Sequence, residues 1–136
     1  MIFYRIGCII LVLTGLLHLT SHFQKYVPQN DTEKQLVDLM ENYVVNVAGA
    51  EVTMAKIQEG FGFWFALSLV WLGAMSLFLV KQLGENKALV RKIAGLNASA
   101  LLMGTVISLL YFFFIPTICL ALGLIFFSVA MVKLKQ

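Results

Sequence analysis

Charge is scarce in this sequence. Only 12% of its 136 residues are Asp, Glu, Lys or Arg, whereas 60% are hydrophobic, and a soluble domain carries about twice that charged fraction. A chain of this length cannot hide so much apolar surface in a water-soluble core. The composition therefore excludes an ordinary soluble domain and indicates that a lipid bilayer solvates much of the surface.

Proline and cysteine are also rare, with two of each. Within the long apolar segments only Pro116 interrupts the chain, and proline disfavours helix at the residue before it. Cys8 and Cys119 are expected near opposite faces of the membrane, whereas a disulfide needs Cα atoms within about 7 Å. The sequence therefore predicts two buried free thiols.

Four apolar segments are each long enough to cross a bilayer, because about 20 helical residues span roughly 30 Å of hydrocarbon. They cover about residues 3–23, 60–80, 89–114 and 115–132. The last two segments follow each other directly, and we expect the chain to turn back at Pro116. The predicted fold class is all-α: one transmembrane domain over residues 1–136, built as a four-helix bundle. Tyr4, Tyr26, Trp64 and residues 112–114 are expected as interfacial or lipid-facing aromatic side chains.

The basic residues favour one orientation in the membrane. Seven of the ten Lys and Arg residues flank the spans on the side of the two termini: Arg5, Lys81, Lys87, Arg91, Lys92, Lys133 and Lys135. The other three, Lys25, Lys34 and Lys56, lie in segment 24–59 together with six of the seven acidic residues. The positive-inside rule then predicts that both termini and the loop between the second and third spans lie in the cytoplasm. Because orientation accounts for the net charge of +3, no nucleic-acid partner is expected.

Segment 24–59 is expected outside the cytoplasm as an amphipathic helix between the first two spans. Asn30 and Glu33 resemble an N-terminal capping pair. Apolar residues then recur at steps of three and four, which predicts a helical stripe that bends near Gly49 and runs into the second span. The stripe consists of Leu36, Met40, Tyr43, Val47, Ala50, Met54 and Ile57. It fits a passive cap on the bundle as well as a lid or a partner-binding helix.

Three spans each carry a face of small and partly polar residues, which we expect to turn toward the other helices. The faces are Gly7, Leu11, Thr14, His18 and Ser21 in the first span; Glu59, Gly62, Ala66 and Gly73 in the second; and Asn97, Gly104, Ser108 and Tyr111 in the third. Close helix packing accounts for the small residues but not for the ionisable ones, and an ionisable group within a span is a functional candidate.

The candidate ligand-binding residues are therefore His18, His22, Glu59, Tyr111 and Asn97. Helix rise places His18 about 8 Å below the outer boundary, and His22, Glu59 and Tyr111 are expected near the same height. Two histidines four residues apart can share a metal ion with Glu59 as third ligand. They can also relay a proton, hydrogen-bond a quinone or lipid headgroup, or form a structural clasp.

Two stretches resemble a known group of proteins. Gly15-Leu-Leu-His18-Leu-Thr-Ser-His22 and Glu59-Gly60-Phe61-Gly62-Phe63 are similar to small bacterial four-span membrane proteins of uncharacterised function, which carry a Gly-x-x-His-x-x-x-His first helix and a Gly-Phe-Gly second helix. Ala55-Lys56 departs from the aromatic–acid pair of that group. The layout is also similar to DoxX-like four-helix proteins, some of which are linked to quinone-dependent redox chemistry.

These observations leave two classes of function open. The first is a protein that binds a lipid, quinone or other hydrophobic small molecule, or that serves as a partner subunit. The second is a membrane redox or metal-dependent enzyme that uses His18, His22 and Glu59. Membrane lipid is an expected partner in either case. A protein partner or a homo-oligomer, a quinone or a transition metal, and the question of enzymatic activity all remain open.

Overall fold

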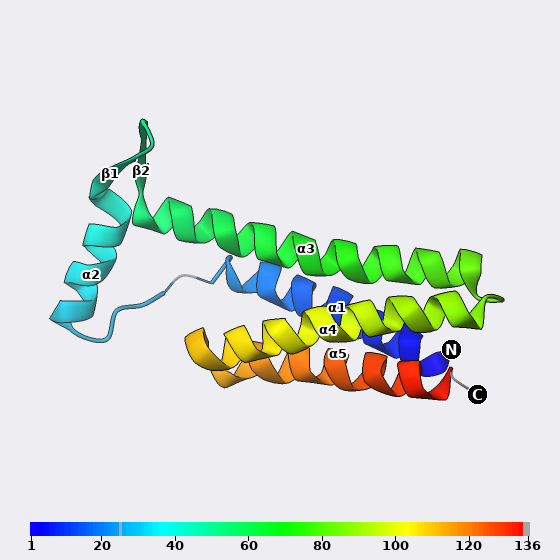
Figure 1. Cartoon of the computed structure of the whole chain (residues 1–136). Helices are drawn as coiled ribbons and strands as arrows, with labels where there is room; N and C mark the ends of the chain where they lie inside the picture. The colour runs from blue at the N-terminus through cyan, green and yellow to red at the C-terminus, as the bar shows by residue number, and fades with distance from the viewer. Residues whose placement is uncertain (25, 135–136) are drawn as a thin grey trace.

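The computed structural model describes residues 1–24 and 26–134. In that part of the chain, helices and one β-hairpin follow each other along the sequence (Figure 1). Their bounds are α1 Ile2–Ser21, α2 Asp31–Asn42, β1 Val44–Val47, β2 Ala50–Thr53, α3 Met54–Leu83, α4 Lys87–Tyr111 and α5 Phe114–Lys133. Lys25 and Lys135, two of the basic residues counted from the sequence, lie outside the described residues.

Four helices, α1, α3, α4 and α5, are long and apolar enough to cross a membrane. They pack against each other as an all-α bundle, which confirms the predicted fold class of a multi-pass membrane protein. Figure 1 shows both termini and the turn between α3 and α4 at one end of the bundle, which we call the terminus end. α2 and the hairpin lie at the other end, which we call the cap end.

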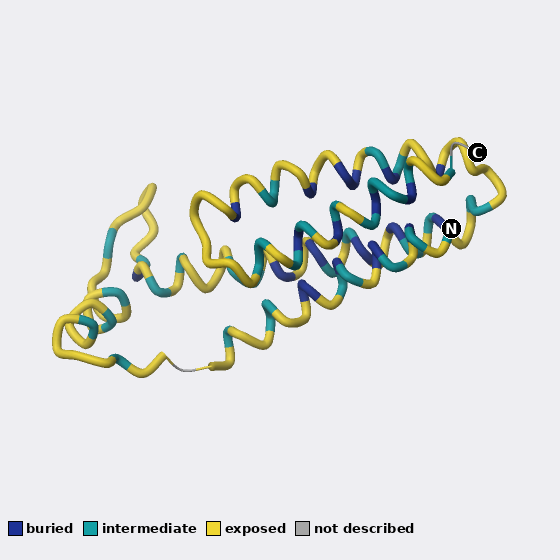
Figure 2. The backbone as a smooth tube through the Cα atoms, turned by 90° about the horizontal axis from the view of Figure 1, so that it is seen from below, coloured by how far each residue is buried: buried dark blue, intermediate teal, exposed yellow. Residues whose placement is uncertain are grey.

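α1 is the central helix of the bundle. It packs along α3 on one side and along α5 on the other, and α4 lies along α5. The buried residues follow the inner sides of these four helices (Figure 2). Tyr4, Cys8, Leu11 and Phe127 are each 0% exposed, so the core lies mainly toward the terminus end. Both cysteines are free thiols as predicted, Cys8 buried and Cys119 half-buried.

Glycine brings α1 and α3 into backbone contact. A Cβ atom placed on Gly15 would lie 2.6 Å from the carbonyl oxygen of Ala66, and one placed on Gly73 would lie 2.7 Å from that of Cys8. Non-bonded carbon and oxygen atoms do not approach so closely, so any larger residue would push the helices apart. Ala66 and Gly73 belong to the small-residue face predicted for the second span, which is therefore the surface on which α3 packs against α1. The contact on α1 is made by Gly15 and Cys8, which lie outside the face predicted for the first span, and Gly7 of that face packs against Phe127 of α5.

The turn between α4 and α5 lies earlier than predicted. The break falls at Phe112 and Phe113, and Pro116 lies inside the first turn of α5. Proline is tolerated there because the first backbone N–H groups of a helix have no partner within the helix. Across the turn, the hydroxyl groups of Ser108 and Thr117 form a hydrogen bond of 2.8 Å, which joins the ends of the two helices.

The predicted start of the cap helix is confirmed, but its predicted length is wrong. Asn30 is the N-cap of α2, and its Oδ1 accepts a hydrogen bond of 2.9 Å from the backbone N–H of Glu33. α2 ends at Asn42, however, and the following residues form an antiparallel hairpin of β1 and β2 instead of a continued helix.

The hairpin follows from residues that disfavour helix. β1 is rich in valine, whose branched side chain loses rotamer freedom in a helix and suits a strand. Ala48 and Gly49 form a two-residue turn with φ values of 53° and 88°, and positive φ at both positions is what a tight hairpin requires. Asn46 strengthens the turn, because its Oδ1 accepts a hydrogen bond of 3.0 Å from the N–H of Gly49.

Glu33 connects the first turn of α2 to the linker that follows α1 through three hydrogen bonds. Its Oε2 accepts hydrogen bonds from the Tyr26 hydroxyl at 2.6 Å and from the Gln29 backbone N–H at 2.7 Å, and its Oε1 accepts one from Asn30 Nδ2 at 3.0 Å. The Tyr26 hydrogen bond is the main cause that lowers the pKa of Glu33 below its ordinary 4.5. The same hydrogen bond raises the pKa of Tyr26 above its ordinary 10.0.

We predict that low pH weakens the hydrogen bonds by which Glu33 holds the start of α2 to the preceding linker. Well above pH 4.5 the Glu33 carboxylate is ionised in folded and unfolded chains alike, and the stabilisation is complete. It shrinks as pH falls below that value and is lost once the pH passes the lowered pKa of the folded state. Hydrogen exchange of residues 26–34 should therefore accelerate at low pH.

Glu33→Gln should show the fast exchange already at neutral pH. Glu41→Gln, an exposed position on the same helix, is the matched control and should exchange like the parent. Equal exchange of the Glu33→Gln variant and the parent at neutral pH would contradict the role of Glu33.

Candidate functional site

The two candidate histidines lie where α1 ends. His18 is in the last turn of the helix, and His22 is its C-terminal cap, whose N–H donates to the carbonyl oxygen of Leu19 at 3.3 Å. Side chains four residues apart share a helix face, and both imidazoles contact rings of α3. The two histidine ring centroids lie 5.1 Å apart with their planes at 88°.

Two phenylalanines of α3 complete a group of four rings. His22 stacks on Phe63 with centroids 4.7 Å apart and planes at 25°, and His18 meets Phe65 edge-on at 5.2 Å and 86°. Gly62 permits this packing, because a Cβ atom at that position would overlap the His22 imidazole. We call His18, His22, Phe63 and Phe65 the ring cluster. Both histidines and Phe63 are half-buried, and Phe65 is 38% exposed.

One buried polar atom of the ring cluster has no partner among the described residues. His22 Nε2 is buried, and no hydrogen-bond partner for it is present among residues 1–24 and 26–134. A buried polar atom without a partner costs about 1–3 kcal/mol, and such an atom requires an explanation such as a bound molecule. An imidazole nitrogen donates when it carries a proton and accepts when it does not. The ring cluster thus contains one buried imidazole nitrogen that lacks a partner among the described residues and lies among aromatic rings.

Glu59 and Tyr111 do not join the ring cluster. Glu59 is exposed on α3, and Tyr111 is 78% exposed at the end of α4. Because α3 begins at Met54, well before the expected start of the span, Glu59 lies where α3 projects past the end of α1. Within the described ranges no group of three or more His, Cys, Asp or Glu is placed to hold a metal ion. The expected metal site of the two histidines and Glu59 is therefore not assembled.

Asn97 lies away from the ring cluster, in the buried part of the bundle. Its Nδ2 donates to the Oγ of Ser76 at 3.0 Å, and the two residues are 6% and 2% exposed. This hydrogen bond joins α4 to α3, two helices that otherwise touch little. Buried amide and hydroxyl groups hold membrane helices together in this way. Asn97 therefore links α4 to α3, and we call its hydrogen bond with Ser76 the clasp between these helices.

Tyr4 is buried in the core of the bundle, so the expectation that its side chain lies at the membrane interface is wrong. It is 0% exposed, and its ring meets that of Phe127 edge-on at 5.3 Å and 86°. Its hydroxyl is buried near the side chains of Ser76 and Asn97, and it forms no well-aligned hydrogen bond in the part of the chain that the structure describes. The sequence held a signal for this placement, because Tyr4, Leu11 and His18 follow each other at seven-residue intervals, which keeps them on one helix face.

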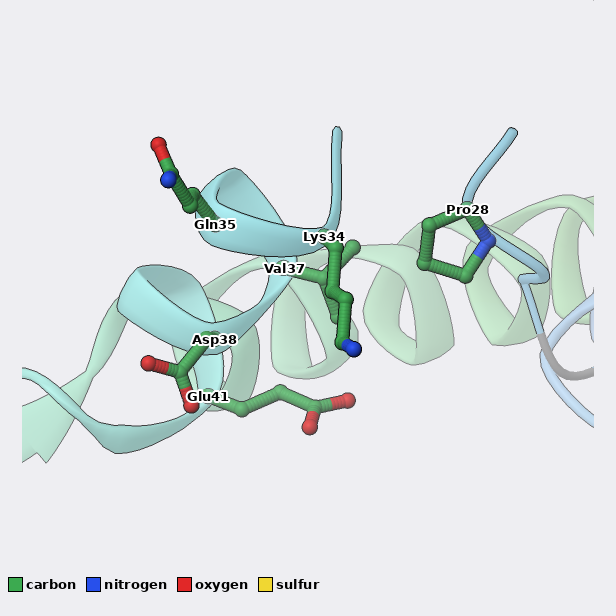
Figure 3. A pocket seen from close by; sticks show the side chains of 6 residues that line it. All are labelled: Pro28, Lys34, Gln35, Val37, Asp38 and Glu41. Carbon is green, nitrogen blue, oxygen red and sulfur yellow. The ribbon is translucent and has the colours of Figure 1, made fainter. Parts of the chain in front are cut away.

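A separate depression of about 370 Å³ lies on the cap. Figure 3 shows its lining side chains, most of which belong to α2. They are Pro28, Lys34, Gln35, Val37, Asp38 and Glu41. Charges of both signs on an exposed helix are typical of a solvated face, so this depression adds no candidate to those of the ring cluster.

Comparison of the chain with protein-family models, curated proteins and solved structures finds no match. The resemblance of the first two spans to four-span bacterial proteins therefore stays an expectation.

We predict that Asn97→Leu lowers the free energy of unfolding by about 0.5–2 kcal/mol, as expected for a lost hydrogen bond between membrane helices. Denaturant unfolding of the detergent-solubilised protein measures the change. Ser99→Ala is the matched control on α4, because the Ser99 hydroxyl is exposed and bonds within its own helix to the carbonyl oxygen of Leu96. An Asn97→Leu variant as stable as the control would contradict the clasp.

Proposed function

We propose that this protein binds a membrane-resident hydrophobic molecule, of the lipid or quinone kind, at the ring cluster. The buried Nε2 of His22, which has no partner among the described residues, carries the proposal. An oxygen atom of a ligand headgroup, carbonyl or phosphate, would satisfy this nitrogen. Phe63 and Phe65 would give the headgroup apolar walls. A few polar groups among apolar and aromatic side chains are typical of small-molecule sites.

The position of the ring cluster supports a ligand that resides in the membrane. His22 directly follows the last residue of α1, so its unpartnered nitrogen would lie near the boundary of the span, at the depth where an amphiphile carries its polar group. The apolar tail of such a ligand would remain in the bilayer. The protein would then bind the headgroup without having to enclose the whole molecule.

The alternatives make different demands on the site. A metal-dependent enzyme needs a third ligand for the ion, and among the described residues neither Glu59 nor another His, Cys, Asp or Glu is placed to share an ion with the two histidines. A partner subunit needs an apolar surface outside the bundle, and the cap carries Leu36, Leu39 and Tyr43, which are 56%, 59% and 62% exposed. Both alternatives predict that no hydrophobic ligand co-purifies with the protein.

We predict that the protein purified in mild detergent holds a hydrophobic ligand that organic solvent extracts and mass spectrometry detects. His22→Phe keeps a ring for stacking on Phe63 but removes the nitrogen. One hydrogen bond is worth about 0.5–1.5 kcal/mol, so ligand affinity should fall roughly two- to tenfold. Thr20→Ala is the matched control, because its exposed hydroxyl bonds within α1 to Leu17.

Equal ligand content in His22→Phe and in the control would contradict the role of the nitrogen. Stoichiometric transition metal that disappears in a His18→Ala, His22→Ala double variant would favour the enzyme instead. Absence of both ligand and metal would favour the partner subunit, which a pull-down from native membranes then tests.

We also propose that the protein resides in a bacterial inner membrane with its termini in the cytoplasm. Six described basic residues lie toward the terminus end: Arg5, Lys81, Lys87, Arg91, Lys92 and Lys133. Toward the cap end the described chain has two lysines, Lys34 on α2 and Lys56 in the first turn of α3, and is rich in acidic residues. This asymmetry supports a cytoplasmic terminus end under the positive-inside rule.

The expected orientation can be measured with cysteines at Gln29 and Glu85, one at each end of the bundle, in a variant without the two native cysteines. A membrane-impermeant maleimide should label Gln29→Cys in intact cells, and Glu85→Cys only after the membrane is permeabilised. Glu85 is exposed and its replacement spares the neighbouring N-cap of α4. Labelling of Glu85→Cys alone in intact cells would reverse the orientation.

A further inference from the structure

Basic side chains lie toward the terminus end of all four spanning helices (Figure 1). Described residues 1–24 and 60–134 contain a single acidic residue, Glu85, in the turn between α3 and α4. The basic residues are all exposed, and we call them the basic belt: Arg5 in α1, Lys81 in α3, Lys87, Arg91 and Lys92 in α4, and Lys133 in α5. The described part of the terminus end therefore carries a clear excess of positive charge.

The positive charge is densest where α3 turns back into α4. Residues 81–92 contain four basic side chains and one acidic side chain, so this short segment has a net charge of +3. Charges of one sign that lie close together add to a common electrostatic potential, which attracts groups of the opposite sign. The start of α4 is therefore the part of the basic belt where an anion is attracted most strongly.

The length of α4 places these side chains at the level of the lipid headgroups. Its 25 residues make a helix of about 37 Å, roughly 7 Å longer than the hydrocarbon layer is thick. The other end of α4 is apolar up to Tyr111, and charged side chains leave the hydrocarbon layer. The excess length therefore lies at the start of the helix, where Lys87, Arg91 and Lys92 reach the headgroups.

An apolar stripe continues from the basic residues toward the middle of the span. Lys92, Leu96, Ser99 and Met103 follow each other at steps of four and three, which keeps them on one helix face. All four are exposed, Leu96 by 69% and Met103 by 67%, whereas Ala94 and the other buried residues of α4 lie on the opposite face. One lipid can therefore contact Lys92 with its headgroup and the stripe with an acyl chain.

The net charge of the lipid decides how strongly this surface attracts it. Every glycerophospholipid has a phosphate, but a zwitterionic one also has an ammonium group, which the basic side chains repel. The two effects largely cancel, whereas a lipid of net negative charge retains the attraction. Lipid is also the partner that covers both the basic residues and the apolar stripe, because its headgroup and its acyl chains already lie at these two depths.

We propose that the terminus end binds glycerophospholipids of net negative charge, most strongly at the start of α4. The headgroup contacts Lys87, Arg91 and Lys92, and an acyl chain lies along Leu96 and Met103. The proposal concerns the kind of lipid and not the side of the membrane, so it holds for either orientation. It does not involve the ring cluster and is independent of the ligand proposed there.

Two tryptophan reporters, one toward each end of the bundle, provide the test. Leu96→Trp combined with Trp64→Phe and Trp71→Phe places the reporter on the apolar stripe. Trp71→Phe alone retains Trp64, which is 72% exposed toward the cap end, as the control. Each protein is reconstituted in phosphatidylcholine vesicles that contain a minor fraction of brominated phosphatidylglycerol, phosphatidylethanolamine or phosphatidylcholine. Quenching of the tryptophan fluorescence then reports which lipid is adjacent.

At the Leu96→Trp reporter, brominated phosphatidylglycerol should be enriched roughly fivefold over brominated phosphatidylcholine, the factor that one basic residue near the surface provides. Brominated phosphatidylethanolamine should show no enrichment there, and Trp64 should show none for any lipid. High salt should reduce the enrichment, because it screens exposed charges.

Charge variants identify the residues responsible. The combination of Lys87→Gln, Arg91→Gln and Lys92→Gln should abolish the enrichment of phosphatidylglycerol. Replacing the same three residues by the other basic residue, as Lys87→Arg, Arg91→Lys and Lys92→Arg, should retain it and controls for the number of substitutions. Lys34→Gln, on α2 at the cap end, should leave it unchanged.

Four results would overturn the proposal. Equal enrichment at Trp64 would mean that the terminus end is not selective, and persistence in the triple glutamine variant would mean that the three basic residues do not bind the lipid. Equal enrichment of phosphatidylethanolamine would contradict selection by net charge. Absence of any enrichment would mean that the basic belt serves a soluble anion or an acidic protein instead. Because both leaflets carry the same lipids, orientation does not affect the result.

Discussion

The backbone contact between α1 and α3 is the constraint on which the rest of the structure depends. Gly15 lies against the backbone of Ala66, and Gly73 lies against that of Cys8, so each helix supplies a glycine where the other supplies its main chain. In lipid, helices gain little from burying apolar side chains, and close packing takes over as the driving force. These two glycines fix both the distance and the axial register of the two helices.

That register also places the ring cluster. With α1 and α3 in contact, the end of α1 reaches the first turns of α3, and the His22 imidazole lies over Gly62 and against Phe63. The two other long helices join the pair at different points. Phe127 of α5 packs its ring against Gly7 of α1, and Asn97 of α4 reaches α3 through its hydrogen bond. The bundle is therefore most tightly fixed toward the terminus end, and the histidines lie where the packing opens.

Local patterns in the sequence predicted the features that depend on neighbouring residues. Hydropathy found the four spans, and the spacing of Asn30 and Glu33 found the start of α2. Features that depend on how one helix is placed against another were predicted less well. The expected start of the second span places Glu59 at the same membrane depth as His22. In the structure α3 continues past the end of α1, and Glu59 is exposed there. The sequence pattern did not predict the hairpin, because its valines also fit the spacing of a helical stripe. Only the turn at Ala48 and Gly49, where φ is positive at both residues, distinguishes the two structures.

Burial alone does not distinguish a functional polar residue in a membrane span from a structural one; the state of its hydrogen bonds and its access from outside the fold do. The Tyr4 hydroxyl also lacks a hydrogen bond among the described residues, but its side chain is 0% exposed inside the bundle, whereas His22 is half-buried at the end of α1. Asn97 and Ser76 are buried and satisfy each other, so their desolvation is offset within the fold and nothing further is required of them. His22 presents a buried nitrogen that the described chain leaves without a partner, and that cost of burial is offset only by a group from outside the fold. A histidine that served the fold alone would be replaced at lower cost by phenylalanine, since stacking on Phe63 needs only the ring. The unsatisfied nitrogen is therefore the reason to look for a ligand at the end of α1 and not at the buried clasp.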